Sequence, residues 1–463
     1  MAVQKNIRKV AFDILYKVET DKAYTNLILN HEIKNNALSR LDSSFVSAVV
    51  YGVLERKLTL DYIIKQYSKF PVDKSDIKTL ILLRTGIFQL LFMDKVPDSA
   101  AVNETVNLSK KLGVYKSAGF INGLLRNFIR SDKNYKLPDK KNISHYLSVK
   151  YSVSEDIINL WLKSYGNKNT IEMLERLQGR PPLTVRINTL KSDKQSVQSQ
   201  LRGEGIKTEE IPFLKDALNL VNTGSIESLS SYKEGNIYVQ DASSQLCVEL
   251  LNPLPDSVLI DVCAAPGGKS FTASQIMQNK GTVYSFDIYE HKVKLIEKTA
   301  RHLSASVIKA SVRDAADAAP LNIYADRIIC DVPCSGFGVM RRKPEIRYKE
   351  VISGQRAADD NHVSFGGGIL DLAETQYRIL CNSSKSLKSS GVLFYSTCTL
   401  NPYENGMNAE RFLRENSDFI PLEINLPEGI ERKIDEPVNH LTLFPQTADT
   451  DGFFIAAFTK ERR

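Results

Sequence analysis

Two cysteines stand where predicted strands end, at positions that suit nucleophilic chemistry. The first closes Asp331-Val332-Pro333-Cys334, and the second lies in Ser396-Thr397-Cys398-Thr399. A thiolate can add to carbon 6 of a pyrimidine ring, which makes carbon 5 nucleophilic enough to accept a methyl group. The pattern therefore predicts covalent chemistry on a base, with Cys398, Cys334 and Asp331 as catalytic residues.

The remaining cysteines do not share this position, and an isolated cysteine is more often a small buried hydrophobic residue than a nucleophile. We expect structural roles for the thiols of Cys247, Cys263, Cys330 and Cys381. Six cysteines without a CxxC pair, together with six scattered histidines, argue against disulfides and against a zinc site. We therefore expect free thiols and no metal.

A glycine-bearing turn, Cys263-Ala264-Ala265-Pro266-Gly267-Gly268-Lys269, follows an apolar run and precedes a predicted helix. Its proline and glycines let the backbone approach a ligand closely. Asp287 ends the next predicted strand, 19 residues beyond Gly268, where an acidic residue suits a ribose diol. Asp314 follows the third strand and suits an adenine amino group. The series predicts an adenosine-type cofactor, and the turn lacks the pattern of an ATP-hydrolysing loop.

The nucleophile needs help, because only a few per cent of a thiol with a pKa near ~8.5 is ionised at neutral pH. Positive charge near Cys398 is expected from Lys269, Arg341, Arg342 and Lys343. Asp331 could act on the base in either of two protonation states. A protonated carboxyl group would bond ring N3 and the amino edge of the base, whereas an ionised one would bond the amino group alone.

The elements that position these residues are short apolar runs separated by helical stretches, from about residue 237 onward. The runs cover 258–260, 283–286, 305–308, 327–330 and 391–395. This alternation predicts an α/β fold with a doubly wound, mostly parallel sheet. Ligands of such sheets bind outside the carboxyl ends of the strands, where all the motifs above fall.

The N-terminal part is different. Residues 1–135 show helical spacing without strand signals, and the lysine-rich stretch 132–143 is a predicted linker. Residues 144–235 predict a small α+β module, with helices near 154–165, 168–178 and 192–204 and strands at 183–187 and near 206–211. Residues 236–463 then form the α/β domain.

Charge is unevenly distributed along the chain. Residues 1–150 carry 25 Lys and Arg against 14 Asp and Glu, a net charge of +11, although the whole chain carries only +7. A basic N-terminal part is typical of a module that binds a polyanion, although a lysine-rich helical domain gives the same count. No signal peptide or membrane span is visible, so we expect a cytoplasmic protein, and a monomer because no dimerisation motif is seen.

Nearly the whole chain resembles the RNA 5-methylcytosine methyltransferases of the RsmB (Sun/Fmu) type. Besides the cysteine motifs and the turn, the resemblance includes these stretches: Ala11–Leu15, Tyr51–Leu54, Arg84–Gly86, Val96–Glu104, Phe120–Arg126, Arg180–Thr189 and Tyr238–Asp241. It implies a NusB-like helical RNA-binding domain over 1–135, a small module over 144–235, and a methyltransferase domain over 236–463. S-adenosylmethionine is the implied cofactor and 16S ribosomal RNA, free or in an early assembly intermediate, the implied partner.

The same resemblance implies residue roles. Residues 263–269 would hold the methionine part of the cofactor, Asp287 its ribose, and Asp314 and Asp331 would complete the pocket. Cys398 would attack carbon 6 and Cys334 would assist product release. DNA cytosine methyltransferases use the Pro-Cys residue as nucleophile, so the presence of both cysteines favours RNA.

Three rival interpretations stay open from the sequence. The same chemistry could act on tRNA, or the chain could be a non-catalytic RNA-binding, antitermination-like protein. A nicotinamide-dependent enzyme lacks support, since no residue that handles a hydride is visible. The stretch from Tyr348 to Asp371 is longer than is typical of the family by about a dozen residues. Its polar part, 353–368, reads either as a loop beside the site or as a spacer.

Overall fold

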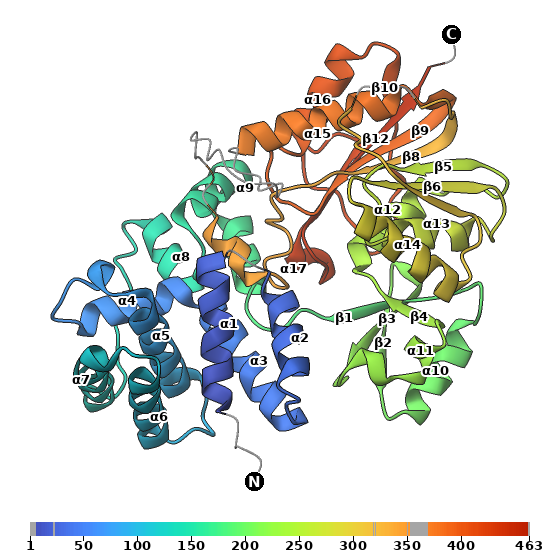
Figure 1. The fold of residues 1–463 in the computed structure, drawn as a ribbon. Helices are drawn as coiled ribbons and strands as arrows, with labels where there is room; N and C mark the ends of the chain where they lie inside the picture. The colour runs from blue at the N-terminus through green and yellow to red at the C-terminus, as the bar shows by residue number, and fades with distance from the viewer. Residues whose placement is uncertain are drawn as a thin grey trace. The chain divides into compact units, whose positions relative to one another are not determined.

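The chain forms two compact units, which are described separately (Figure 1). The computed structural model describes residues 6–21, 24–317, 319, 321–349, 351 and 369–461. The first unit comprises residues 1–178 and 342–350, and the second comprises 179–341 and 351–463. The predicted loop at 353–368 lies outside the described residues. No helix in the described part of the chain is both long and apolar enough to cross a membrane.

The first unit is helical, as predicted for residues 1–135. Its helices are α1 (Ile7–Asp21), α2 (Thr25–Asn35), α3 (Arg40–Glu55), α4 (Lys57–Tyr67), α5 (Ile77–Phe92), α6 (Asp98–Lys111), α7 (Ala118–Arg130), α8 (Ile143–Tyr151) and α9 (Glu155–Arg176), with 3-10 turns η1 (Val72–Lys74) and η2 (Tyr115–Ser117). One apolar cluster joins α1 to α7 and buries Phe12, Leu60 and Phe128. Helical spacing of apolar residues thus produces one shared core.

Helices α8 and α9 group with the first unit, although we predicted a boundary before residue 144. The reason is contact with α4, where the Thr59 hydroxyl donates to the Val149 carbonyl at 2.6 Å. Within α9, Gly166 has φ 74° and ψ 172°, which breaks the helix. The two helices predicted at 154–165 and 168–178 are confirmed by this break.

A short segment from the middle of the second unit's sequence completes the first unit. The 3-10 turn η4 (Pro344–Tyr348) carries Arg347, whose buried guanidinium donates to the carbonyls of Glu55, Tyr151 and Leu177. These carbonyls lie at the C-terminal ends of α3, α8 and α9, where helices leave acceptors unpaired. One cation therefore satisfies three helix ends.

The second unit begins with a small antiparallel sheet in the order β2-β3-β1-β4. Its elements are β1 (Leu183–Ile187), α10 (Lys194–Gly203), β2 (Lys207–Ile211), β3 (Leu214–Val221), η3 (Ile226–Ser228), α11 (Ser230–Lys233) and β4 (Ile237–Val239). Val197 and Leu201 of α10 pack on it. The predicted strands and helix are confirmed here, while β3 was not predicted.

The larger sheet has the order β10-β12-β9-β8-β5-β6-β7, with β11 paired to β12. Its strands are β5 (Val258–Asp261), β6 (Thr282–Asp287), β7 (Ile308–Val312), β8 (Ala325–Asp331), β9 (Leu387–Thr397), β10 (Phe419–Pro421), β11 (His440–Leu443) and β12 (Phe453–Lys460). The five strands from β9 to β7 are parallel, and β10, β11 and β12 pair antiparallel. The predicted mostly parallel sheet is confirmed, with β7 starting at Ile308 rather than at residue 305.

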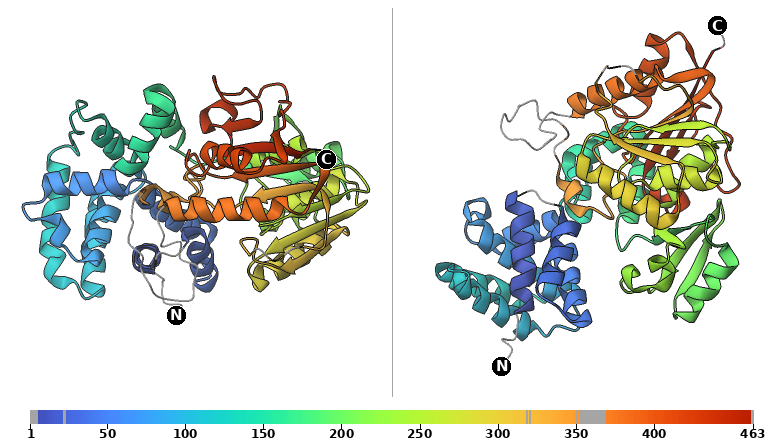
Figure 2. Two further views of the ribbon diagram at one scale, coloured as in Figure 1. Left: turned by 90° about the horizontal axis from the view of Figure 1, so that it is seen from above. Right: turned by 45° about the vertical axis from the view of Figure 1, so that its right-hand side comes forward.

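Helices cover both faces of this sheet (Figures 1 and 2). They are α12 (Ala242–Leu251), α13 (Gly268–Ile276), α14 (Glu290–Leu303), α15 (Ile369–Ser384), α16 (Gly406–Glu415) and α17 (Pro445–Ala448). Leu259, Ile329 and Phe394 lie in the cluster of α12 and α13. Their neighbours in sequence, such as Ile260, lie in the cluster of α15 and α16. Alternate side chains point to opposite faces of a strand, which explains why these strands are apolar throughout.

Candidate active site

The two cysteine motifs meet at the carboxyl ends of neighbouring strands. Strands β8 and β9 are parallel, and Asp331 at the end of β8 pairs in register with Ser396 of β9. Cys334 and Cys398 follow these ends, and their Sγ atoms lie 3.1 Å apart. The structure thus brings together the two thiols and the aspartate that the sequence singled out.

Backbone and hydroxyl contacts lock the two cysteine loops to each other. The N–H of Gly338 donates to the carbonyl of Cys398 at 3.0 Å, and the hydroxyls of Ser335 and Thr399 lie 2.6 Å apart. Gly338 has no room for a side chain, since a Cβ there would lie 1.9 Å from the Gly452 carbonyl oxygen. The distance between the thiols is therefore set by a packed framework rather than by two free loops.

The thiols differ in their environments. The hydrogen bond with Cys398, reinforced by burial, raises the pKa of Cys334 well above its ordinary value. Burial also raises the pKa of Cys247 and of Cys330 to about 12, and raises that of Cys263. Cys334 is thus held in its protonated form beside Cys398, and the thiols of Cys247, Cys263 and Cys330 stay neutral.

Asp331 forms an ion pair with Lys269 of the glycine turn. The Lys269 Nζ lies 2.6 Å from Asp331 Oδ2, and Asp331 Oδ1 accepts from the Ser396 hydroxyl at 2.9 Å. Burial, the largest single influence, lowers the pKa of Lys269, but Asp331 together with Cys247 and Asp261 raises it overall. Of the two alternatives for Asp331, this pair favours the ionised one, which accepts from an amino group.

Two of the other cations expected near Cys398, Arg341 and Lys343, have partners of their own. Arg341 pairs with Asp449 at 3.1 Å and donates to the carbonyl of Arg180. Arg342 and Lys343 belong to the first unit, where the Lys343 ammonium lies over the ring of Tyr24. The expectation that Arg341 assists the thiolate therefore has no support, because its ion pair with Asp449 was not visible in the sequence.

The turn at residues 263–269 links β5 to α13. Gly267 has φ 108°, which favours glycine, and a Cβ there would lie 2.3 Å from the ring of Phe271. The N–H of Ala264 donates to the Phe286 carbonyl, which ties the turn to β6. Helix α13 starts at Gly268, so its free N–H groups open toward the strand ends, where anionic groups bind well.

The predicted adenosine-binding acids lie beside this turn. Asp287 ends β6 and is nearly buried, with Oδ1 accepting from the N–H of Tyr289. The N–H of Arg313 donates to the Asp287 carbonyl, which brings the exposed Asp314 to the same edge of the sheet. Both acids thus stand at the carboxyl ends of neighbouring strands, as expected.

A third acid under the turn was given no role from the sequence. Asp261 is fully buried at the end of β5, where its Oδ2 accepts from the Ser270 hydroxyl and burial raises its pKa to about 7. Within the described part of the chain its Oδ1 has no hydrogen-bond partner. An unpaired buried acceptor beside a glycine cradle fits a site completed by a polar, adenosine-bearing ligand.

Similarity to known proteins identifies the family. Family models match the 16S rRNA methyltransferase RsmB/F at residues 248–459, the NusB family at 5–130 and the RsmF/B-like ferredoxin-like domain at 155–227. A probable ribosomal RNA small subunit methyltransferase B of Bacillus subtilis is 36% identical, over 98% of this chain and 99% of that protein. The chain belongs to the RsmB/F family of rRNA methyltransferases. It is thus an RNA methyltransferase that uses S-adenosylmethionine.

Further relatives agree with this RsmB/F assignment. A protein of the same description from Synechocystis is 33% identical, over 98% of this chain and 99% of that one. A crystal structure of a methyltransferase homologue from Pyrococcus horikoshii is 26% identical, with a TM-score of 0.57, and covers 69% of this chain and 99% of that one. The resemblance inferred from the motifs is confirmed.

Several residues of this RsmB/F site were not found from the sequence. Gly338 and Gly452 pack together, with the Gly452 N–H donating to the Gly338 carbonyl, and Glu404 bonds the residue after Cys334. The run Pro402-Tyr403-Glu404-Asn405, four residues beyond Cys398, is a signal that a sequence reading could have used. In the described ranges no cluster of three His, Cys, Asp or Glu is arranged to hold a metal ion.

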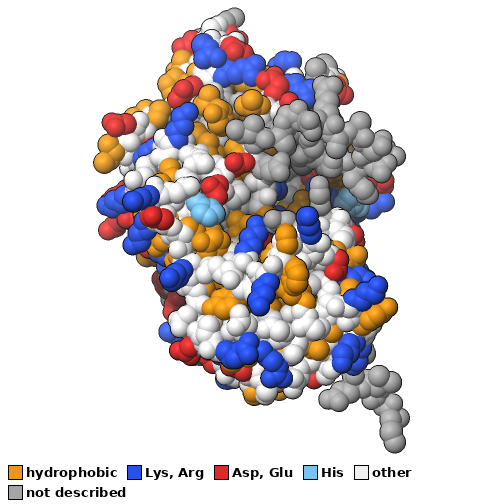
Figure 3. All heavy atoms as spheres, turned by 90° about the vertical axis from the view of Figure 1, so that its left-hand side faces the viewer, with side chains coloured by type: hydrophobic (Ala, Val, Ile, Leu, Met, Phe, Trp, Pro, Cys, Tyr) orange, Lys and Arg blue, Asp and Glu red, His pale blue; other side chains and the backbone are white. Residues whose placement is uncertain are grey.

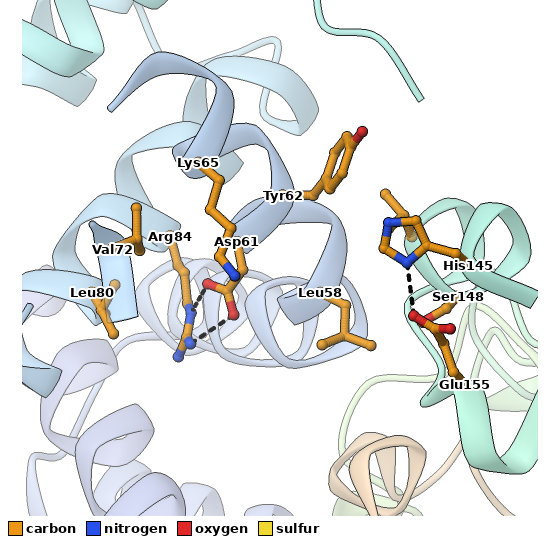
Figure 4. A pocket seen from close by; sticks show the side chains of 11 residues that line it. Leu58, Asp61, Tyr62, Lys65, Val72, Leu80, Arg84, His145, Ser148 and Glu155 are labelled. Atoms are coloured by element: carbon orange, nitrogen blue, oxygen red, sulfur yellow. Dashed lines mark hydrogen bonds and ion pairs between the residues drawn. The ribbon is translucent and has the colours of Figure 1, made fainter. Parts of the chain in front are cut away.

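The first unit of this RsmB/F member contains a separate hollow of about 270 Å³ (Figure 4). Arg84 on its wall is held by both oxygens of Asp61, at 2.6 and 2.9 Å, and by Glu19 at 3.1 Å. Opposite it, His145 bonds Glu155 at 2.7 Å. Because these charges satisfy one another, the hollow is explained as structure and not as a reaction site.

Proposed function

We propose that this enzyme methylates carbon 5 of a cytosine in 16S rRNA through a covalent adduct between Cys398 and carbon 6. The observation that carries the proposal is the pair of thiols 3.1 Å apart, next to Asp331 and at the strand ends that also bear the glycine turn. One nucleophile would need only one cysteine. Two thiols in contact support a division between attack and release.

The environments of the thiols support assigning attack to Cys398. Cys334 keeps its proton, because its hydrogen bond with Cys398 and its burial both raise its pKa. Cys398 follows β9 directly and receives a hydrogen bond from Gly338 N–H on its carbonyl, which fixes its backbone. Cys398 then adds to carbon 6, and Cys334 assists its expulsion after carbon 5 has lost its proton.

Asp331 and Lys269 act on the base in this proposal. The carboxylate accepts from the cytosine amino group, which orients the ring over Cys398 and excludes a carbonyl at the same position. Lys269 holds the Asp331 carboxylate in place, since its Nζ lies 2.6 Å from Asp331 Oδ2. A uracil would present a carbonyl oxygen to this carboxylate, so the pair favours cytosine.

The cofactor site uses the same strand edge. Residues 263–269 would hold the methionine part, Asp287 the ribose and Asp314 the adenine amino group, with Asp331 completing the pocket. S-adenosylmethionine bound there supplies the electrophilic methyl group. The protein's own contribution is to orient the base and to hold the proton of Cys334.

The RNA partner is supported by charge. Residues 1–150 carry a net charge of +11, and the face drawn in Figure 3 sets Lys and Arg side chains among apolar ones. Cationic side chains supply most sequence-independent affinity for nucleic acid. We propose that residues 1–135 bind rRNA and that 236–463 carry out the reaction on an unstacked base.

The test is methyl transfer from labelled S-adenosylmethionine to unmodified 16S rRNA, with native protein, Cys398→Ala, Cys334→Ala and the matched control Cys381→Ala. We expect native protein and the control to label one cytosine, and Cys398→Ala to label none. Cys334→Ala should accumulate an RNA–protein adduct that survives denaturant and that the additional Cys398→Ala change abolishes.

The outcomes separate the alternatives. Label on tRNA but not on 16S rRNA would keep the chemistry and reject the substrate. Full activity of Cys398→Ala would reject the adduct mechanism. No label on either RNA would favour the non-catalytic RNA-binding interpretation.

A further inference from the structure

A buried carboxylate without a cationic partner lies between the two cysteine loops. Glu404 is fully buried, and among the residues that the structure describes it forms no ion pair. A charge in such a place is costly unless hydrogen bonds replace its water. Its position six residues beyond Cys398 makes it part of the loop that follows the nucleophile.

Three donors from three segments converge on this carboxylate. Its Oε2 accepts from the N–H of Ser335 at 2.8 Å and from Gln376 Nε2 of α15 at 2.7 Å. Its Oε1 accepts from Asn401 Nδ2 at 2.7 Å. The same Gln376 amide also donates to the Pro333 carbonyl at 2.9 Å. The residues on both sides of Cys334 are therefore tied to Glu404, directly or through one side chain.

We propose that Glu404 is a positioning residue for product release, holding the loop of Cys334 so that its thiol meets Cys398. The inference rests on the proposed function, in which Cys334 assists the expulsion of Cys398. Cys398 directly follows the end of β9 at Thr397, whereas Cys334 lies three residues beyond the end of β8 at Asp331. Loss of the Glu404 carboxylate therefore displaces Cys334 more than Cys398.

Glu404→Gln is the sharpest perturbation, because it keeps shape and removes one acceptor. If the new amide nitrogen faces Ser335 and Gln376, it meets two donors. If the new amide nitrogen faces Asn401, the side-chain amide of Asn401 must rotate. The Asn401 nitrogen then faces the N–H of Tyr403, which in the native protein donates to the Asn401 oxygen at 3.2 Å. Either way one donor is left facing another, and the loops must move apart.

The matched control is Glu410→Gln. Glu410 lies on α16, in the same region of the chain, and its side chain is exposed. The two variants lose the same charge and gain the same amide, so a difference between them reports the buried contacts. Melting temperature and binding of S-adenosylmethionine are measured for both, which establishes that each is folded.

The first measurement is independent of RNA. Diamide oxidises two adjacent thiols: both lose their protons, a disulfide bond forms, and the N=N bond is reduced to a hydrazine. We expect native protein and Glu410→Gln to form the Cys334–Cys398 disulfide rapidly, as read by peptide mapping. Glu404→Gln should form it at least about tenfold more slowly, since a displacement of ~1 Å can reduce a reaction rate about 10²-fold.

The second measurement is the adduct assay. Glu404→Gln should turn over slowly and accumulate the denaturant-stable RNA–protein adduct, as Cys334→Ala does. A merely structural role would instead reduce adduct formation, turnover and cofactor binding together. Cross-linking at the native rate, or slow turnover without accumulated adduct, would overturn the proposal.

Two contingencies keep the test decisive. If Glu404→Gln does not fold, Gln376→Met takes its place, because methionine removes the amide that donates to both Glu404 and the Pro333 carbonyl. Disulfide formation at the native rate in Gln376→Met would count equally against the proposal. If native protein labels no RNA, the proposed function fails. The cross-linking comparison would still decide whether Glu404 positions the two thiols.

Discussion

Arg347→Met tests how much one cation at three helix ends stabilises the first unit. The guanidinium donates to Leu177 O at 2.8 Å, to Glu55 O at 3.1 Å and to Tyr151 O at 3.4 Å. Methionine fills similar volume but donates nothing, so acceptors at the ends of α9, α3 and α8 lose their partner.

The size of the effect follows from these contacts. A buried acceptor left unpaired costs about 1–3 kcal/mol, and the two shorter bonds account for most of the loss. Burying the guanidinium has a free-energy cost in the native protein, as the pKa of Arg347, which burial lowers, indicates. Methionine removes this cost, which offsets part of the loss. We therefore expect the free energy of unfolding to fall by about 2–4 kcal/mol.

The chain offers a specific probe for this measurement. Trp161 is the only tryptophan, lies on α9 and is fully buried in the first unit. Urea unfolding followed by its fluorescence thus reports this unit, and the midpoint should fall without a change in slope. Arg130→Met is the control, because Arg130 stands exposed in the last turn of α7. A midpoint equal to that of the control would refute the reasoning.

Two further predictions concern the second unit. Gly338→Ala should abolish methyl transfer, because the new Cβ would lie 1.9 Å from Gly452 O and 2.8 Å from Cys398 O. The control Gly406→Ala should stay active, because nothing lies within 4 Å of the new Cβ. Equal activity of the two variants would contradict the packing argument. Burial, followed by the charge of Arg432, lowers the pKa of His440 from 6.5 to about 4, which corresponds to about 3 kcal/mol. As the pH falls below 6.5, His440 takes up a proton in the unfolded chain, whereas in the folded chain it does so only near pH 4. The contribution of neutral His440 to the free energy of unfolding is therefore complete above pH 6.5 and is lost as the pH falls to 4. Thermal unfolding of His440→Phe between pH 7.5 and 5 should show a smaller pH dependence than native protein, and an unchanged dependence would assign the effect elsewhere.

The parallel strands were predictable because their signal is local. Strands covered on both faces are apolar throughout, and each ends at a polar residue such as Asp287 or Asp331. Adjacent ends of parallel strands share one edge, so Cys334 and Cys398 were expected together before any distance was known. The antiparallel strand β12 was missed, since the run Phe453–Lys460 gives no turn or motif that marks its partner β9.

Electrostatic partners were the part that sequence spacing did not reveal. Four cations were expected near Cys398, yet Lys269 pairs with Asp331 and Arg341 with Asp449, a residue 108 positions further along the chain. Such pairs depend on where loops from distant segments pack. The same holds for the first unit, where Arg347 satisfies carbonyls up to 292 positions away.

The arrangement around the thiols gives the buried Glu404 a role in holding the two cysteine loops together. Two loops that follow parallel strands have no shared ladder beyond the strand ends, so individual contacts such as Gly338 N–H to the Cys398 carbonyl must join them. Glu404 adds a further link by accepting from Ser335 on one loop and from Asn401 on the other. A neutral side chain would accept fewer hydrogen bonds, and a lysine partner would compete with Ser335 for the carboxylate. A carboxylate that accepts from both loops can therefore restrain Cys334 beside Cys398 in a way that a side chain with fewer acceptor sites cannot.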